Sequence, residues 1–121
     1  MGNVVAAALE LVAIEEVRPL LDPARSPFSA EELAYARSKR DPERRLGARL
    51  AAKRAAALLL GDGFDLADAE VLRGRFGPPR LKLSARALDR LRELGADGVL
   101  LSLSHGREHA LASVLFVKRD T

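Results

Sequence analysis

The chain of 121 residues has no cysteine and no tryptophan, and it has a single tyrosine. Without cysteine, a disulfide framework and a thiolate site are both excluded, and such a chain suits the cytoplasm. The few aromatic residues do not alternate with basic ones, which argues against stacking of a single-stranded nucleic acid. The chain also lacks a run of about 18 apolar residues, so we expect no membrane-spanning helix.

Hydrophobic residues make up 48% of the chain and charged residues 31%, a balance typical of a folded protein and not of disorder. We therefore expect one domain over residues 1–121. The formal net charge of +3 is typical of a soluble surface and would favour an acidic partner. A small nucleic-acid-binding domain is a less favoured alternative, because only the charge supports it.

The apolar segment 4–14 alternates loosely, which predicts a strand, although its three consecutive alanines permit a helix. It contains a glutamate and has no basic start, so we do not interpret it as a signal peptide. The residues on one side of this strand are Val5, Ala7, Leu9 and Leu11.

Residues 28–39 begin with clear helix signals. Ser29 is a candidate N-cap, and Glu32 stands three residues later as its partner in a capping box. Phe28 and Leu33 occupy the two positions of a hydrophobic staple. The pattern predicts a helix that starts at Ser29.

A second, longer helix is predicted from Pro42 to about Leu60, with Asp41 as cap candidate and Gly61 as the stop. Four-residue steps place Arg54 between Leu50 and Leu58 in an apolar stripe that also includes Leu46 and Ala57. An arginine inside such a stripe needs a carboxylate, an oxyanion or a route to water.

The sequence pattern in the second half of the chain predicts shorter strands and a shorter helix. Two short strands are expected at 69–73 and around Leu81 and Leu83, joined by a turn at 74–79. Ser84 can cap a helix that ends at Gly95. Strands at 99–104 and 109–117 should form a hairpin. This order predicts an α+β fold with a mostly antiparallel sheet packed against the long helix.

Several segments together resemble one known family. The segments, with their sequences, are 10–14 (ELVAI), 28–35 (FSAEELAY), 49–55 (RLAAKRA), 77–81 (GPPRL), 101–105 (LSLSH) and the last strand, 110–116. In this order they resemble D-I/L-V-E-I, F-T-x-x-E-L-x-Y, R-F-A-A-K-E-A, G-K-P-x-L and S-I/L-S-H, followed by the final strand, of the holo-acyl-carrier-protein synthases. These are small, single-domain 4′-phosphopantetheinyl transferases.

The resemblance implies a fold and a reaction. The fold would be 4′-phosphopantetheinyl transferase-like. Such enzymes transfer the 4′-phosphopantetheine arm of coenzyme A (CoA) to a serine of an apo acyl or peptidyl carrier protein and release adenosine 3′,5′-bisphosphate. They are usually homotrimers with CoA sites between subunits, and a cytoplasmic location is expected.

The resemblance also implies site residues. Glu10, Lys53 and Arg54 take the positions of the family's catalytic residues. Cofactor-binding positions fall on Arg49, Lys53, Arg54, Pro79, Ser104 and His105. His105 and His109 are four residues apart, but a hairpin separates them, so they do not match a helical zinc pair.

The chain departs from the family where a metal would bind. In the family, Mg²⁺ is held by the aspartate of the first strand and the glutamate of the helix, and here these positions are Glu10 and Arg54. Glu10 could still ligate a cation, whereas an arginine stays protonated and cannot. A lysine that usually follows in the helix is replaced by Leu58, and a glutamate of the first strand by Ala13.

We therefore expect a Glu10–Arg54 ion pair in place of the metal, and Mg²⁺-dependent transfer that is reduced or lost. The sequence leaves open whether the chain is an enzyme or a catalytically silent relative that binds CoA or joins another subunit.

A basic cluster surrounds the junction of the two predicted helices. A solvated face is its default interpretation, and recognition of an acidic carrier protein is the sharper one. Against carrier recognition, Glu16 stands where the family often has an arginine, although Arg18 is close. The cluster consists of Arg37, Lys39, Arg40, Arg44 and Arg45.

Overall fold

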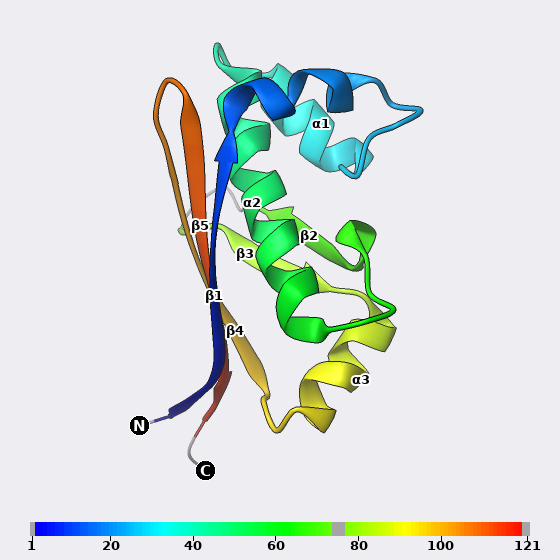
Figure 1. The fold of residues 1–121 in the computed structure, drawn as a ribbon, viewed down its shortest axis with the longest axis vertical. Helices are drawn as coiled ribbons and strands as arrows, with labels where there is room; N and C mark the ends of the chain where they lie inside the picture. Colours follow the sequence, from blue (N-terminus) through cyan, green and yellow to red (C-terminus); the bar gives the residue numbers. More distant parts are fainter. Residues whose placement is uncertain (1, 74–76, 120–121) are drawn as a thin grey trace.

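The computed structural model describes residues 2–73 and 77–119, and it has the predicted α+β fold (Figure 1). A three-stranded antiparallel sheet has the strand order β1-β5-β4, and a separate two-stranded hairpin is formed by β2 and β3. The strands are β1 (Asn3–Ala13), β2 (Ala69–Leu72), β3 (Arg80–Leu83), β4 (Gly98–His105) and β5 (His109–Lys118). The α-helices are α1 (Ala30–Arg37), α2 (Pro42–Leu60) and α3 (Ala85–Glu93).

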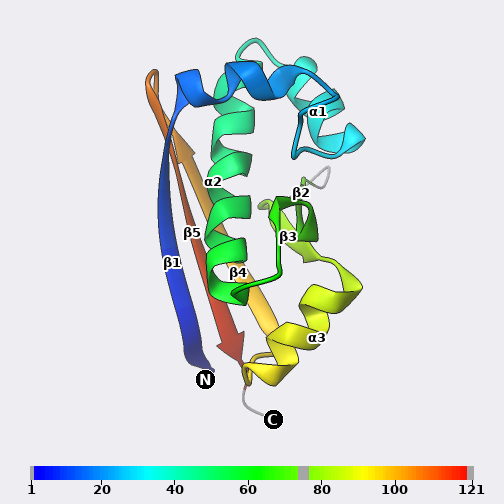
Figure 2. The same ribbon diagram turned by 45° about the vertical axis from the view of Figure 1, so that its right-hand side comes forward.

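Helix α2 is the centre of the molecule. It packs along one face of the β1-β5-β4 sheet, and the β2–β3 hairpin packs on its other side (Figure 2). Helix α1 lies near the start of α2, whereas α3 lies at the end of the molecule where both chain termini are found (Figure 1). Among the helices that the structure describes, none is long and apolar enough to cross a membrane.

The helix starts follow from local sequence. The Ser29 hydroxyl accepts a hydrogen bond from the Glu32 amide at 3.1 Å, and the Glu32 carboxylate accepts one from the Ser29 amide at 2.9 Å. The predicted capping box is therefore confirmed. At the start of α2, Asp41 does not cap the helix but accepts a hydrogen bond from Arg45 Nε at 3.2 Å. The helix ends at Gly61, whose φ of 94° suits glycine.

The side chains on the two faces of β1 differ in size and not only in polarity. The inward face carries the small side chains of Ala6 and Ala8, which pack with Ala55 and Ala56 of α2. Leu9 and Leu11, on the opposite side, remain 65% and 61% exposed. Small side chains on both elements let the helix approach the strand closely, so the larger apolar side of β1 forms the outer surface of the sheet.

The predicted apolar stripe of α2 is correct only in its first half. Leu46 and Leu50 are fully buried, whereas Leu58 is 66% exposed. Each four-residue step advances about 40° beyond a full turn of an α-helix, so the stripe rotates out of the core after Leu50. Arg54 therefore lies at the boundary between the core and the solvent.

Candidate functional site

Lys53 lies in the interior of the protein and is 1% exposed. Its ammonium group is 2.7 Å from Glu32 Oε1 and also donates to the carbonyl oxygens of Leu66 and Ala69. These partners come from α1 and from the segment that leads into β2. The charge of Lys53 is thus fully matched by groups of the protein itself, and no face of the ammonium group is open to a ligand.

Glu32 completes this buried network. One of its carboxylate oxygens accepts from the Ser29 amide and contacts Lys53, and the other accepts from the Val71 amide at 3.0 Å. A buried ion pair is stable only when its remaining hydrogen-bonding positions are satisfied, and here they are. The pair therefore joins α1, α2 and β2 at one point.

Arg49 lies one turn before Lys53 and is 4% exposed. Its guanidinium stacks 4.2 Å from the centre of the Tyr35 ring, and its Nη1 makes a long hydrogen bond of 3.4 Å to the Arg45 carbonyl. Within the described part of the chain, its Nε has no hydrogen-bond partner. Burial lowers the pKa of Arg49 against the opposing effects of Tyr35 and Glu32, yet an arginine keeps its charge at neutral pH.

Arg54 pairs with Glu16 and not with Glu10, so the predicted Glu10–Arg54 pair is wrong. Arg54 Nη1 lies 3.3 Å from Glu16 Oε1, and the other oxygen of Glu16 accepts from the Ala13 amide at 2.8 Å. The chain turns after β1 into a 3-10 helix, Ile14–Glu16, that contacts α2, and this turn brings Glu16 to Arg54. The hydrogen bond from Ala13, reinforced by Arg54, lowers the pKa of Glu16 against the opposing effect of burial.

Glu10 is half-buried in β1, opposite Ala112 of β5. It forms no ion pair with any residue that the structure describes. Residues 2–73 and 77–119 also contain no group of three histidine, aspartate or glutamate side chains that could hold a metal ion. With Arg54 at the second family position, the residues present do not fit the Mg²⁺ that the resemblance implies.

Ser104 and His105 end β4 at an exposed hairpin. The hairpin is closed by a 2.8 Å hydrogen bond from the Gly106 amide to the His109 carbonyl, as the sequence predicts. Pro79 lies far along the chain, directly before β3, and is half-buried. The predicted turn at 74–79 lies partly outside the described residues, because 74–76 are not among them.

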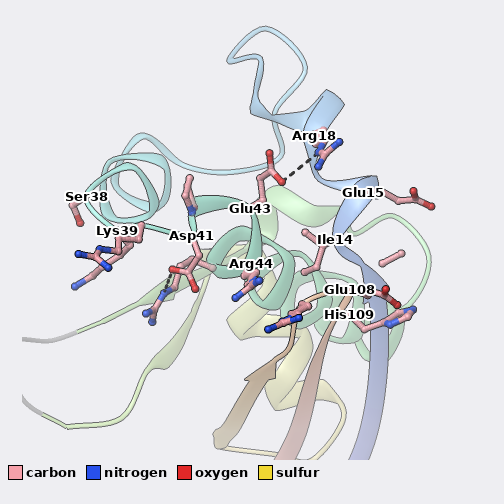
Figure 3. A pocket seen from close by; sticks show the side chains of 15 residues that line it. Ile14, Glu15, Arg18, Ser38, Lys39, Asp41, Glu43, Arg44, Glu108 and His109 are labelled. Atoms are coloured by element: carbon pink, nitrogen blue, oxygen red, sulfur yellow. Dashed lines mark hydrogen bonds and ion pairs between the residues drawn. The ribbon is translucent and has the colours of Figure 1, made fainter.

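A large, open pocket lies at the start of α2 (Figure 3). Its volume is about 1290 Å³, and three segments far apart in the sequence contribute to it. Its basic residues are Arg18, Lys39, Arg40, Arg44, Arg45 and Arg107, with His109 at the hairpin. We call it the basic pocket.

Some charges of the basic pocket are already paired. Arg18 lies 3.3 Å from Glu43, and Arg45 lies 3.2 Å from Asp41. In Figure 3, Arg44 lies between Asp41 and the hairpin. Most of the basic cluster predicted from the sequence therefore lines one concave surface.

A second, smaller pocket of about 180 Å³ lies between α1, α2 and the β2–β3 hairpin. It is lined by Glu31, Tyr35, Arg49, Val71, Leu72, Arg73 and Arg80, and we call it the arginine pocket. Of the predicted cofactor residues, Arg49 lines this pocket, and none lines the basic pocket.

Sequence reasoning missed the partners of the two motif cations. Glu32 was assigned only to a capping box, although its carboxylate also reaches Lys53. Glu16 was noted only as a departure from the family at a position that often holds arginine. A glutamate there and an arginine at position 54 are reciprocal changes of charge, and that signal could have identified the pair.

Comparisons with known proteins agree with this architecture. No family model matches the chain. The holo-acyl-carrier-protein synthase of Anaeromyxobacter sp. strain K is 36% identical over 117 residues, which cover 88% of this chain and 91% of that protein. The solved structure of holo-acyl-carrier-protein synthase from Neisseria meningitidis matches with a TM-score of 0.79 and 23% identity, over 94% of this chain and 98% of that chain. The ACPS–CoA complex from Chronobacterium ammoniagenes matches with a TM-score of 0.72 and 26% identity, over 95% of this chain and 97% of that chain.

The sheet, the central helix and the ordered motifs are those of a small phosphopantetheinyl transferase. More narrowly, the chain belongs to the holo-acyl-carrier-protein synthase family.

Proposed function

We propose that the protein acts on CoA and an acyl or peptidyl carrier protein, with a Mg²⁺-dependent transferase activity that is reduced or lost. The reaction would form a phosphodiester between the carrier serine and the pantetheine phosphate. A P–O bond of the CoA diphosphate would break, adenosine 3′,5′-bisphosphate would leave with the bonding electron pair, and the proton of the serine hydroxyl would pass to water. Support comes from the family and from a relative of similar fold that is described as a CoA complex.

The Arg54–Glu16 pair is the observation on which we base an altered Mg²⁺ dependence of the transfer reaction. Phosphoryl transfer depends largely on positioning and on neutralising phosphate charge. A guanidinium can bind a phosphate through two hydrogen bonds, but it does not polarise an attacking oxygen as a metal does. We therefore assign to Arg54 a part in gripping the diphosphate and assign no step to a metal ion. Lys53 would contribute by holding α2 in place, because its ammonium group is enclosed.

A catalytically silent relative that binds CoA or joins another subunit is the second candidate. The observation that favours it is the same pair, because Glu16 engages Arg54 Nη1, one of the nitrogens that Arg54 would use to hold a diphosphate.

We further propose a homotrimer and a cytoplasmic location. The outer face of the β1-β5-β4 sheet supports assembly, since Leu9, Leu11 and Leu100 are 65%, 61% and 54% exposed on it. Apolar patches of this kind mark interfaces.

The proposed function is tested by transfer and binding together. The mass of an apo carrier protein is followed with CoA, with and without Mg²⁺, and CoA binding is measured by calorimetry under the same conditions. Weak transfer with metal-independent CoA binding is the expected result. Robust Mg²⁺-dependent transfer would contradict altered metal dependence, and absence of CoA binding would favour a structural partner.

A variant sharpens this test. Arg54→Glu returns a carboxylate to the helix position where the family resemblance places a metal ligand, and we expect it to restore Mg²⁺ dependence to CoA binding. Arg92→Glu is the matched control, because Arg92 is an exposed arginine on α3 whose reversal changes the net charge equally. Equal effects of the two variants would contradict the assignment of Arg54 to the metal position.

A further inference from the structure

The outer edge of β2 is buried, although within residues 2–73 and 77–119 the strand pairs only with β3, on its other edge. Ala69 and Val71 are 1% and 3% exposed, and Val71 packs in one core cluster with Leu33 and Ala36 of α1. Water therefore cannot reach the backbone groups that point away from β3. A buried N–H or C=O group without a partner is costly, so these groups need partners from the protein.

Two charged side chains supply those partners. The Glu32 carboxylate accepts a 3.0 Å hydrogen bond from the Val71 amide. The Lys53 ammonium group donates to the Ala69 carbonyl and lies 2.7 Å from Glu32. Alternate residues of a strand point their backbone groups to the same edge, so a parallel neighbour would bring one N–H and one C=O to these two positions. The ammonium group and the carboxylate present the same donor and acceptor.

We infer that Glu32 and Lys53 are positioning residues, which together take the place of a neighbouring strand on β2 and so fix the β2–β3 hairpin against α1 and α2. A two-stranded hairpin is only marginally stable in water unless a third strand or a packed helix supports it. Here two helices each contribute one side chain to that support. The second backbone partner of Lys53, the Leu66 carbonyl, lies before β2 and holds the segment that enters the hairpin.

The position of the hairpin matters because the arginine pocket lies beside this pair. Val71 lines the pocket, and so does Arg49, which stands one turn before Lys53 on α2. Arg49 and Pro79 are predicted cofactor-binding positions, one on the helix and one directly before β3. By fixing the hairpin relative to α2, the pair sets how these two positions face each other. This consequence for CoA binding rests on the proposed function.

Amide hydrogen exchange of the full chain tests the strand replacement directly. Glu70 pairs with Lys82 across the hairpin, and its amide faces β3, whereas the Val71 amide on the outer edge has only Glu32 as its acceptor. We expect these two amides of the wild type to exchange at rates within about tenfold of each other, as members of one cooperative unit do. A Val71 amide that exchanges faster than this would overturn the inference, because the edge would then be open.

Two double variants separate the hydrogen bond from the charges. Glu32→Gln/Lys53→Met and Glu32→Leu/Lys53→Met both remove the buried charges, but only the first keeps an acceptor for the Val71 amide. In the second we expect Val71 exchange to be at least about tenfold faster and CoA affinity at least about tenfold lower than in the first, because the support of the binding residues is lost. Asp89→Asn/Arg92→Met, the control, loses an exposed ion pair on α3 and should change neither quantity.

Equal Val71 exchange in the two double variants would overturn the strand replacement, and equal CoA affinity would overturn the positioning role. If Glu32→Leu/Lys53→Met does not fold, the wild-type comparison and Glu32→Gln/Lys53→Met decide. The latter must keep the Val71 amide protected and bind CoA within about tenfold of the wild type, and failure of either would overturn the inference. If the wild type does not bind CoA, the proposed function fails, whereas the exchange rates still decide whether the pair replaces a strand.

Discussion

Arg54 Nη1 lies 3.3 Å from Glu16 Oε1, and this contact joins the turn after β1 to the middle of α2. The side chains are 36% and 45% exposed, so water screens the pair and its contribution to folding is about 0–1 kcal/mol. The guanidinium of Arg54 and the carboxylate of Glu16 therefore contact each other at the position where the family resemblance places an exchangeable metal ion.

The first prediction concerns Glu16. Glu16→Gln removes the negative charge and keeps an oxygen that can accept the Ala13 hydrogen bond, so Arg54 becomes available. We expect a few-fold increase in metal-independent CoA affinity and a stability change within about 1 kcal/mol, as for an exposed pair. Calorimetry and urea unfolding measure the two effects. A lower affinity in Glu16→Gln would show that Arg54 does not contact the ligand.

The second prediction concerns the buried pair. Lys53→Met leaves the charge of Glu32 without its partner inside the protein, and we expect a loss of about 3–5 kcal/mol in the free energy of unfolding. The double variant Glu32→Gln/Lys53→Met retains an acceptor for the Ser29 and Val71 amides and buries no charge. It should recover much of that loss in urea unfolding. A double variant no more stable than Lys53→Met would show that charge matching is not the cause.

The third prediction concerns Asp68, which is 5% exposed and accepts hydrogen bonds from Arg86 and Ser84. The hydrogen bond from Arg86, with those from the Asp65 amide and Ser84, lowers the pKa of Asp68 to about 2 from 3.8. Because the pKa is lower in the folded state, this stabilisation is complete above about pH 4 and is lost as the pH falls towards 2.

We therefore expect Asp68→Asn to be less stable than the wild type at pH 6 by about 1–3 kcal/mol, the usual cost of weakening hydrogen bonds to a charged group. The difference between the two proteins should shrink at pH 3. Urea midpoints at pH 6, 4 and 3 measure it. A constant difference across this range would show that Asp68 does not titrate as described.

The fourth prediction concerns the outer face of the sheet. Leu11→Asp places a charge among exposed apolar side chains of β1, and we expect it to convert an oligomer into a monomer in light scattering and sedimentation. Leu58→Asp is the control, because Leu58 is equally exposed but lies on α2, away from that face. A wild type that is already monomeric at high concentration would contradict the proposed assembly.

Local signals predicted the elements well because their causes are local. The Ser29–Glu32 box and Pro42 and Gly61 at the ends of α2 each depend on neighbours within a few residues. The partner of Arg54 could not be found in this way, since Glu16 is 38 positions away and reaches it only after the chain turns at the end of β1. Glu10, on a strand adjacent to the helix, was the nearer choice in family terms and the wrong one.

The burial of Lys53 also could not be predicted from charge statistics. Lysines are rarely buried unless they are paired, and the partner comes from α1, at a position that capping alone explains. The three arginines of the arginine pocket belong to segments that no motif connects, so only the structure brings them together.

Two neighbouring positions on α2 have separate roles. Lys53 is buried and joins three elements through its partners, whereas Arg54 lies at the boundary with solvent, where a substitution should disturb the fold less. The fold can therefore accept a different residue at position 54 while the network around Lys53 stays in place. Among relatives, we expect a lysine at this motif position to indicate that the fold is retained. We expect the residue that follows it to indicate whether the reaction is retained.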